Sequence, residues 1–194
     1  MVFMKRNKWR RSRIRQRDLS DCGPACLASV CAHYGLYVAA SRIRQMAQTD
    51  AQGTSVLGIV QAAMQLGIDA KGVKTNVKLL SLDIMPAIVH VIIGSQRNHF
   101  IVLHSITSRY VTVMDPADGS VRKMTVDEFC QVWTGVAILL SPGENFQRNG
   151  RKSIIQRIFQ TARPHRQHLI AAGCCALLIS GTGLILPTRS RLSA

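Results

Sequence analysis

Cys22 has the sequence surroundings of a reactive thiol. It follows Ser20 and Asp21, two residue types that cap helices, and it precedes Gly23 and Pro24, which suit a first helical turn. The unpaired amides and the dipole at a helix N-terminus stabilise a thiolate. The small Gly23 would also leave room for a substrate backbone. The pattern predicts a nucleophile at Cys22 if a base lies nearby, because most cysteines at helix starts only pack.

His99 and Asp115 flank a predicted β-hairpin with strands at 100–106 and 110–114. A turn centred on Thr107 would place His99 opposite Asp115 on one face, with Cβ atoms about 4.5–5.5 Å apart. Asp115 would then orient the imidazole and fix its tautomer, and the other ring nitrogen would face the thiol. A register slip of one residue would break this pairing.

Gln16 precedes Cys22 by six residues. A glutamine amide beside a cysteine nucleophile can hold the oxyanion that develops on a substrate carbonyl. A glutamine in a basic segment is otherwise usually solvated, so this assignment depends on the rest of the site.

The segment that carries Gln16 and Cys22 resembles the opening of the C39 peptidase domain. The resemblance extends over about residues 10–142 and implies a papain-like cysteine peptidase fold. It also implies that Cys22 is the nucleophile, His99 the base, Asp115 its orienting aspartate and Gln16 the oxyanion-hole donor. Further similar blocks follow in the family's order at residues 53–58, 86–90, 98–103, 115–119, 128–129 and 133–135.

The same resemblance implies a cysteine endopeptidase that removes leader peptides from ribosomally made precursors, either bacteriocins or signalling peptides. Cleavage would follow a double-glycine-type site, where a narrow channel excludes side chains, and apolar residues of the leader would dock in a separate groove. A leader or secretion-substrate docking module without catalysis is the alternative function. Degenerate relatives of the domain lack the cysteine, so the presence of Cys22 favours the enzyme.

In this family the domain begins an ABC exporter that couples cleavage to export. The sequence contains no G-x-x-x-x-G-K-[ST] motif, and Gly150–Ser153 has the wrong spacing for one. We therefore expect the exporter's membrane and ATPase parts to be absent from this chain. It would be either an exporter truncated after its first membrane segment or a protein with separate transport subunits.

Hydrophobic periodicity predicts helices first and an antiparallel sheet second, which is the α+β class. Helices are expected at 20–35, 40–47 and 56–66, with Leu57, Ile59, Val60, Ala63 and Met64 on the buried side of the third. The remaining expected elements are strands at 68–74, 87–93, 100–106, 110–114, 121–124 and 136–140 and short helices at 77–82 and 126–132.

The net charge of +15 is concentrated at the N-terminus and just before an apolar stretch near the C-terminus. We predict a basic N-terminal arm at 1–15, the peptidase domain at 16–142 and a linker with an amphipathic basic helix at 143–165. A transmembrane helix at 166–188 and a tail at 189–194 would follow. The basic flank predicts contact with membrane lipid and a peptidase domain that faces the cytoplasm. The resemblance to C39 domains implies that the membrane is the bacterial cytoplasmic (inner) membrane.

Other sites and partners are disfavoured. Aromatic residues make up only 5% of the chain, which argues against a nucleic-acid partner. Cys26, Cys31 and His33 do not have zinc-ligand spacing, so we expect neither a metal nor a cofactor. His90 and His104 are expected to be structural histidines within strands.

Overall fold

The structure is a computed structural model that describes residues 12–80, 82–94, 97–150, 167 and 175–176. The chain divides into two compact units, Met1–Arg151 and Lys152–Ala194, and nearly all described residues belong to the first. The predicted amphipathic and transmembrane helices lie outside the described residues apart from three isolated positions. In the part of the chain that is described, no helix is long and apolar enough to cross a membrane.

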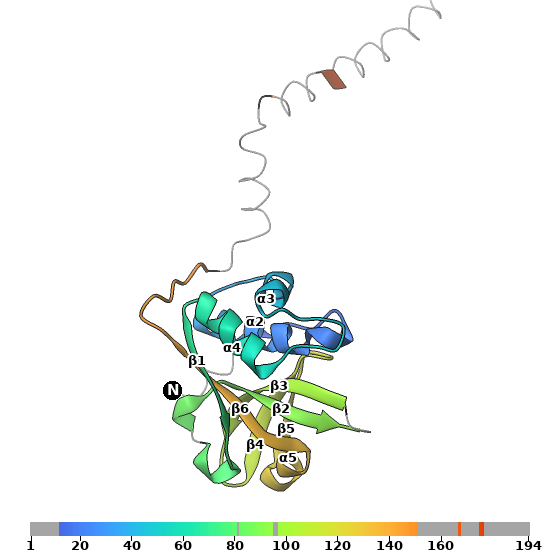
Figure 1. Ribbon diagram of the computed structural model, residues 1–194, viewed down its shortest axis with the longest axis vertical. Helices are drawn as coiled ribbons and strands as arrows, with labels where there is room; N and C mark the ends of the chain where they lie inside the picture. The colour runs from blue at the N-terminus through green and yellow to red at the C-terminus, as the bar shows by residue number, and fades with distance from the viewer. Residues whose placement is uncertain (1–11, 81, 95–96, 151–166, 168–174, 177–194) are drawn as a thin grey trace, which may run out of the picture. The chain divides into compact units, whose positions relative to one another are not determined.

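Three helices form a layer on one side of the sheet (Figure 1). The central helix α2 is buried at every residue from Cys22 to Ala32, so it packs on all sides rather than along one stripe. It ends at Gly35, whose φ of 96° is the left-handed conformation of a helix C-cap. The helices are the 3₁₀ turn η1 (Leu19–Asp21), α2 (Cys22–Tyr34), α3 (Ala40–Met46) and α4 (Val56–Gln65).

Helix α4 is apolar on two faces, and only one of them is buried. Ile59 and Ala63 are fully buried as predicted, whereas Leu57 and Met64 are 64% and 62% exposed. The prediction that all five apolar residues face the core is therefore wrong for these two. At 100° per residue, Leu57 and Met64 lie together on the face opposite Ile59 and Ala63, and only the latter face meets α2.

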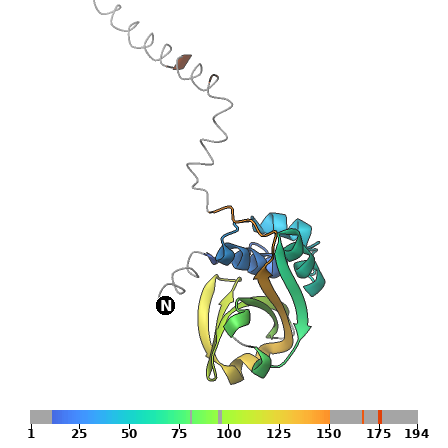
Figure 2. The ribbon, with the colours of Figure 1, turned by 90° about the vertical axis from the view of Figure 1, so that its left-hand side faces the viewer.

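The sheet has six antiparallel strands in the order β1-β6-β2-β3-β4-β5. It curls (Figure 2), and α5 packs on the side away from α2. A capping box fixes the start of α5, because Thr125 and Glu128 each bond the other's backbone amide. The elements are β1 (Ile68–Lys74), η2 (Val77–Leu79), η3 (Leu82–Ile84), β2 (Ala87–Ile93), β3 (Arg97–Ile106), β4 (Tyr110–Asp115), β5 (Ser120–Thr125), α5 (Val126–Val132) and β6 (Trp133–Pro142).

These elements confirm the predicted arrangement of helices followed by an antiparallel sheet. The register predicted for the β3–β4 hairpin is wrong. Val102 pairs with Met114, and nearer the turn Ile106 pairs with Val111. The turn spans Thr107 to Tyr110 rather than centring on Thr107, and an irregularity at His104 moves the pairing back by one residue, which leaves a shift of two near Val102.

Residues 143–150, which the sequence assigns to a linker, are folded back as a strap over the end of α2. The side-chain amide of Asn149 makes two hydrogen bonds with the backbone of Tyr37: its Oδ1 accepts from the N–H at 2.7 Å and its Nδ2 donates to the carbonyl at 3.0 Å. Phe146 packs edge-on against Tyr34 at a centroid distance of 6.3 Å. The compact unit therefore extends past the last strand to the end of the strap.

Candidate active site

The first turn of α2 is held from outside by Arg44 of α3. Its guanidinium bonds the Ser20 hydroxyl at 3.0 Å and forms an ion pair with Asp21. Neither η1 nor α2 has a side-chain N-cap hydrogen bond, so the capping role predicted for Ser20 and Asp21 is wrong. The two side chains instead anchor the residues just before Cys22, which begins α2 and is 5% exposed.

Helix α2 also contacts α4 and β3 within its first two turns. A Cβ on Gly23 would lie 3.0 Å from Thr54 and Ile59, so Gly23 lets α4 approach and does not serve to leave space for a substrate. One turn further on, the Cys26 thiol donates to the Phe100 carbonyl at 3.3 Å. Phe100 follows His99, and this hydrogen bond therefore sets the position of Cys22 along β3.

His99 and Asp115 are hydrogen-bonded, with 2.8 Å between Nε2 and Oδ1. The predicted contact is thus present although the predicted register is not. The β3–β4 register is shifted by two residues near Val102, and a shift of two keeps each side chain on its face. Asp115 is consequently a diagonal rather than a directly opposite neighbour of His99.

The surroundings of His99 and Asp115 shift their pKa values so that His99 is positively charged and Asp115 negatively charged near neutral pH. Burial lowers the pKa of the His99 imidazole, but hydrogen bonds to Asp115 and Cys22 and the charges of these partners raise that pKa to about 9. Burial raises the pKa of Asp115, yet hydrogen bonds from His99 and the Ala117 amide lower it below its usual value. Near neutral pH the site therefore holds an imidazolium between a carboxylate and the Cys22 sulfur.

Gln16 is placed beside this pair by its backbone. Its N–H donates to the Pro116 carbonyl at 2.8 Å, one residue after Asp115. The preceding Arg15 donates to the Ala117 carbonyl at 3.0 Å, so residues 13–16 run along the 115–119 loop instead of standing apart as an arm. Gln16 Oε1 is buried and has no hydrogen-bond partner among the described residues.

The neighbouring cysteines on α2 have inert surroundings. Burial, followed by the charges of Cys22 and Asp115, raises the pKa of the Cys26 thiol well above its usual value. Burial likewise raises the pKa of Cys31 to about 12. Both thiols stay protonated near neutral pH, and Cys22 is the cysteine of this helix that is hydrogen-bonded to His99.

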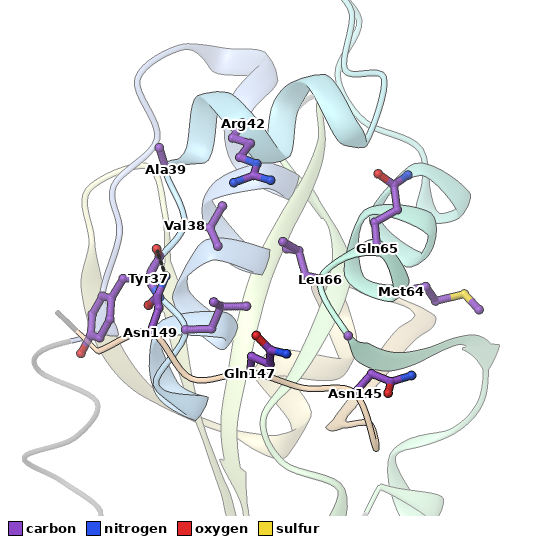
Figure 3. Close-up of a pocket in the computed structure, with 12 residues that line it drawn as sticks. Tyr37, Val38, Ala39, Arg42, Met64, Gln65, Leu66, Asn145, Gln147 and Asn149 are labelled. Carbon is purple, nitrogen blue, oxygen red and sulfur yellow. Dashed lines mark hydrogen bonds between the residues drawn. The ribbon is translucent and has the colours of Figure 1, made fainter. Parts of the chain in front are cut away.

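A hollow of about 640 Å³ lies beyond the other end of α2 (Figure 3). Arg42 of α3, Met64 and Gln65 at the end of α4, and the strap residues Asn145 and Asn149 contribute to its walls. It contains none of the four predicted site residues. Within the described residues no cluster of three or more His, Cys, Asp or Glu could hold a metal ion.

The sequence matches the model of the Peptidase C39 family over residues 10–145. The chain belongs to the Peptidase C39 family. The resemblance found in the sequence is thus confirmed. LagD of Lactococcus lactis subsp. lactis, a lactococcin-G-processing and transport ATP-binding protein, is 35% identical over 136 residues. These residues are 69% of this chain but 19% of LagD, so the chain spans about a fifth of that relative's length.

Two solved C39 domains share the fold described above. The peptidase domain of Streptococcus ComA, a bifunctional ABC transporter in a quorum sensing pathway, has a TM-score of 0.62 at 38% identity. That match covers 66% of this chain and 96% of the ComA domain. A double glycine motif protease from an AMS/PCAT transporter, solved with its leader peptide, has a TM-score of 0.59 at 29% identity, covering 66% and 89%. Residues 10–145 therefore form a cysteine peptidase domain of the C39 family.

Several positioning contacts were not predictable from the sequence. Arg44 lies in a helix with basic neighbours, which indicates a solvated face, and it nevertheless anchors Ser20 and Asp21. The hydrogen bond from Cys26 to Phe100 joins residues far apart in the chain. No local sequence pattern predicts either contact.

We predict that the pKa of His99 depends on Asp115 and not on the nearby Asp118. Asp115→Asn should lower the His99 pKa from about 9, because the carboxylate no longer stabilises the imidazolium. Asp118→Asn should leave it unchanged, since Asp118 is bonded to Ser120 and Arg122 at an exposed turn. NMR titration of the imidazole measures this value directly.

The sign of the accompanying stability change follows from linkage. A raised folded-state pKa means that the stability contributed by His99 is fully present below its unfolded pKa of about 6.5. It is lost as the pH rises through about 9. A His99 pKa that moves in Asp118→Asn and stays in Asp115→Asn would contradict the assignment.

Proposed function

We propose that this chain cleaves the leader from ribosomally made precursor peptides after a double-glycine-type site. Cys22 is the nucleophile, His99 the general base and acid, Asp115 the residue that orients it, and Gln16 the oxyanion-hole donor. The observation that carries the proposal is the 2.8 Å bond between His99 and Asp115 next to the Cys22 sulfur at the start of α2. Membership of the C39 family supports it.

In the proposed reaction, the Cys22 thiolate attacks the carbonyl carbon of the second glycine. His99 Nε2–H remains bonded to Asp115, so the proton on Nδ1 passes to the leaving amine as the C–N bond breaks. The leader is then held as a thioester on Cys22. Water attacks the thioester while His99 takes its proton, and the leader leaves with a free carboxylate and regenerates the thiolate.

The state of Gln16 supports its proposed role. A buried oxygen without a partner costs about 1–3 kcal/mol, so a protein rarely keeps one without a use. The same side-chain amide carries an NH₂ group, and the backbone N–H of Gln16, which donates to the Pro116 carbonyl, places the residue next to the His99–Asp115 pair. An amide that is bonded to no other side chain can turn its NH₂ toward the oxyanion.

The exposed apolar face of α4 is the proposed docking surface for the leader. Leu57 and Met64 are two turns apart on this face, the spacing at which one side of an amphipathic helix presents its apolar residues. The N-terminal end of α4 lies near the active site, because Thr54, two residues before the helix, lies against Gly23 beside Cys22. The double glycine motif protease solved with its leader peptide supports a leader as the occupant.

The proposal also includes the partner subunits of the chain and its location in the cell. The chain would work with the membrane and ATPase parts of an ABC exporter at the bacterial inner membrane. The name of the relative LagD joins processing with transport and ATP binding, which supports this partnership. The uncharged stretch 169–187 would anchor it in lipid, and the basic residues before that stretch would keep the peptidase domain in the cytoplasm.

Replacement of Cys22 should abolish cleavage while the adjacent cysteine is dispensable. Cys22→Ala should lower turnover of a double-glycine leader peptide by roughly 10⁴–10⁶-fold. Cys26→Ala should keep most activity, because it loses a weak hydrogen bond and a small volume. Mass-spectrometric mapping of iodoacetamide adducts should find Cys22 labelled faster than Cys26 at neutral pH.

The other site residues provide graded controls in the same assay. His99→Ala should remove nearly all turnover, and Asp115→Asn should cost roughly 10²–10⁴-fold. Gln16→Ala should cost roughly 10²–10³-fold, whereas Asp118→Asn should have little effect. A wild-type protein that binds the leader without cutting it would favour the docking module over the enzyme.

Polar substitutions on the α4 face should weaken leader binding without slowing the chemistry. Leu57→Ser together with Met64→Ser should raise KM for a full-length leader roughly tenfold, because the apolar contact area is lost. The kcat for this substrate should stay the same. Gln61→Ser, at another exposed position of α4, is the matched control. An unchanged KM in the double variant would place the docking surface elsewhere.

Membrane association of the full chain tests the proposed anchor. After cell lysis the 194-residue chain should sediment with membranes and resist extraction by carbonate. A variant ending at Gly150 should remain in the supernatant with its peptidase activity intact. Recovery of the full chain in the supernatant would rule out the anchor.

A further inference from the structure

A second histidine, His90, lies one strand away from His99. In the β2–β3 ladder His90 pairs with Phe100, and His99 pairs with Val91. The His90 ring packs edge-on against Phe100 at a centroid distance of 5.2 Å. Its side chain is only half-buried. His90 thus lies one strand and one residue from the proposed general base. By alternation its ring is on the face of the sheet that carries Phe100 and packs against α2, whereas Val91 and His99 have the opposite parity.

Thr134 fixes the imidazole of His90 through two hydrogen bonds. Its hydroxyl donates to the His90 carbonyl at 3.0 Å and lies 3.0 Å from the His90 Nδ1. A hydroxyl has one hydrogen, so Oγ1 must accept from Nδ1–H. The Nδ1–H tautomer leaves Nε2 with a free lone pair. No other side-chain hydrogen bond of His90 occurs within the described part of the chain.

A local break in the sheet creates this arrangement. Val89 pairs with Ala137 of β6 and Val91 with Trp133, so three β6 residues stand opposite His90 alone. Gly135, with φ of 82°, lets the strand bulge at this point, and its carbonyl accepts from the Thr75 amide. Thr134 supplies the hydrogen bond that the His90 carbonyl loses to the bulge.

His90 stays neutral beside the charged His99. Burial, followed by the nearby His99 charge, lowers the pKa of His90 below its usual value. Near neutral pH Nε2 therefore accepts a hydrogen bond and cannot donate one. The two histidines have opposite roles, because His99 is bonded to a carboxylate and His90 to a hydroxyl.

We infer that His90 is a substrate-binding residue, whose Nε2 accepts a backbone N–H of the leader in the two residues before the cleaved bond. The inference rests on the proposed function. Glycines have no side chains to bind, so their recognition must use backbone groups in addition to a narrow channel. Phe100, the partner of His90 across the ladder, accepts from Cys26 one helical turn after Cys22, and adjacent strands are about 4.8 Å apart, so His90 lies within a few residues of the attacked carbonyl. Thr134 is the positioning residue.

Ester-for-amide substrates test the hydrogen bond without adding bulk. In each of two leader peptides one glycine of the pair is replaced by glycolic acid, which removes one N–H. The full-length wild-type chain should cleave one of the two esters with kcat/KM lower by roughly 5–10-fold, the loss expected for one hydrogen bond. His90→Phe keeps the ring contact with Phe100 and should lose a similar factor on the all-amide peptide. In His90→Phe the ester peptide should be cleaved with the same kcat/KM as the all-amide peptide, because the hydrogen bond is already absent.

Thr134 variants separate positioning from a structural role. Thr134→Val removes the hydroxyl at constant shape and should abolish the discrimination between amide and ester, whereas Thr134→Ser should retain it. Imidazole ¹⁵N shifts of the full chain should report the Nδ1–H tautomer at His90 in the wild type and in Thr134→Ser, but not in Thr134→Val. This measurement needs no turnover.

Two results would overturn the role of His90. One is an ester penalty that is equal in wild type and His90→Phe for both peptides. The other is an Nε2–H tautomer in the wild-type chain. A wild-type chain that cleaves neither the amide nor the ester peptides would contradict the proposed function, and the tautomer measurement would still decide the state of His90.

Discussion

The contact between the first turns of α2 and the start of β3 determines whether this domain has a site at all. Cys22 and His99 are distant in sequence, and neither is reactive alone. Burial of α2 from Cys22 to Ala32 holds the helix against the sheet, and the weak Cys26–Phe100 hydrogen bond adds to this contact. Arg44 then fixes the chain just before the cysteine. A shift of one helical residue, about 1.5 Å along the axis with a turn of 100°, would direct the thiol away from the imidazole.

The histidines of the sheet show how partners decide charge at similar burial. His99 is 5% exposed and His104 6%, yet burial followed by the charges of His33 and Arg13 lowers the His104 pKa to about 3. His99 differs because Asp115 and Cys22 offset the cost of its burial. His90, bonded to a hydroxyl, remains neutral. Neighbouring strands of one sheet thus carry a charged donor and a neutral acceptor, which suits the proposed reaction, in which a leaving group is protonated while the substrate backbone is held.

The two ends of α2 serve different purposes. Cys22 begins the helix, and a 13-residue helix places its other end about 20 Å away. There the strap of residues 143–150 bonds Tyr37 and packs Phe146 on Tyr34, so the chain leaves the domain from a fixed point. Neither the strap nor the hollow beside it contributes a group to the site. The attachment of the following segment is therefore separated from the chemistry by the length of the helix.

Local sequence determined the elements and the chemical types in the site. Alternating strands, helix-ending glycines and the capping box of α5 are formed by residues close in the chain, so the predicted elements agree with the structure to within a few residues. The contact between His99 and Asp115 was also predictable, because a two-residue error in register preserves the face of every side chain. The exposure of Leu57 and Met64 was not predictable, because apolar residues on two sides of a helix do not show which side packs against a neighbouring element. Nor could the sequence show that Arg44, Cys26 and Thr134 fix the site residues. Their partners are distant in the chain, and only the packing of α2 on the sheet and the bulge in β6 bring them together.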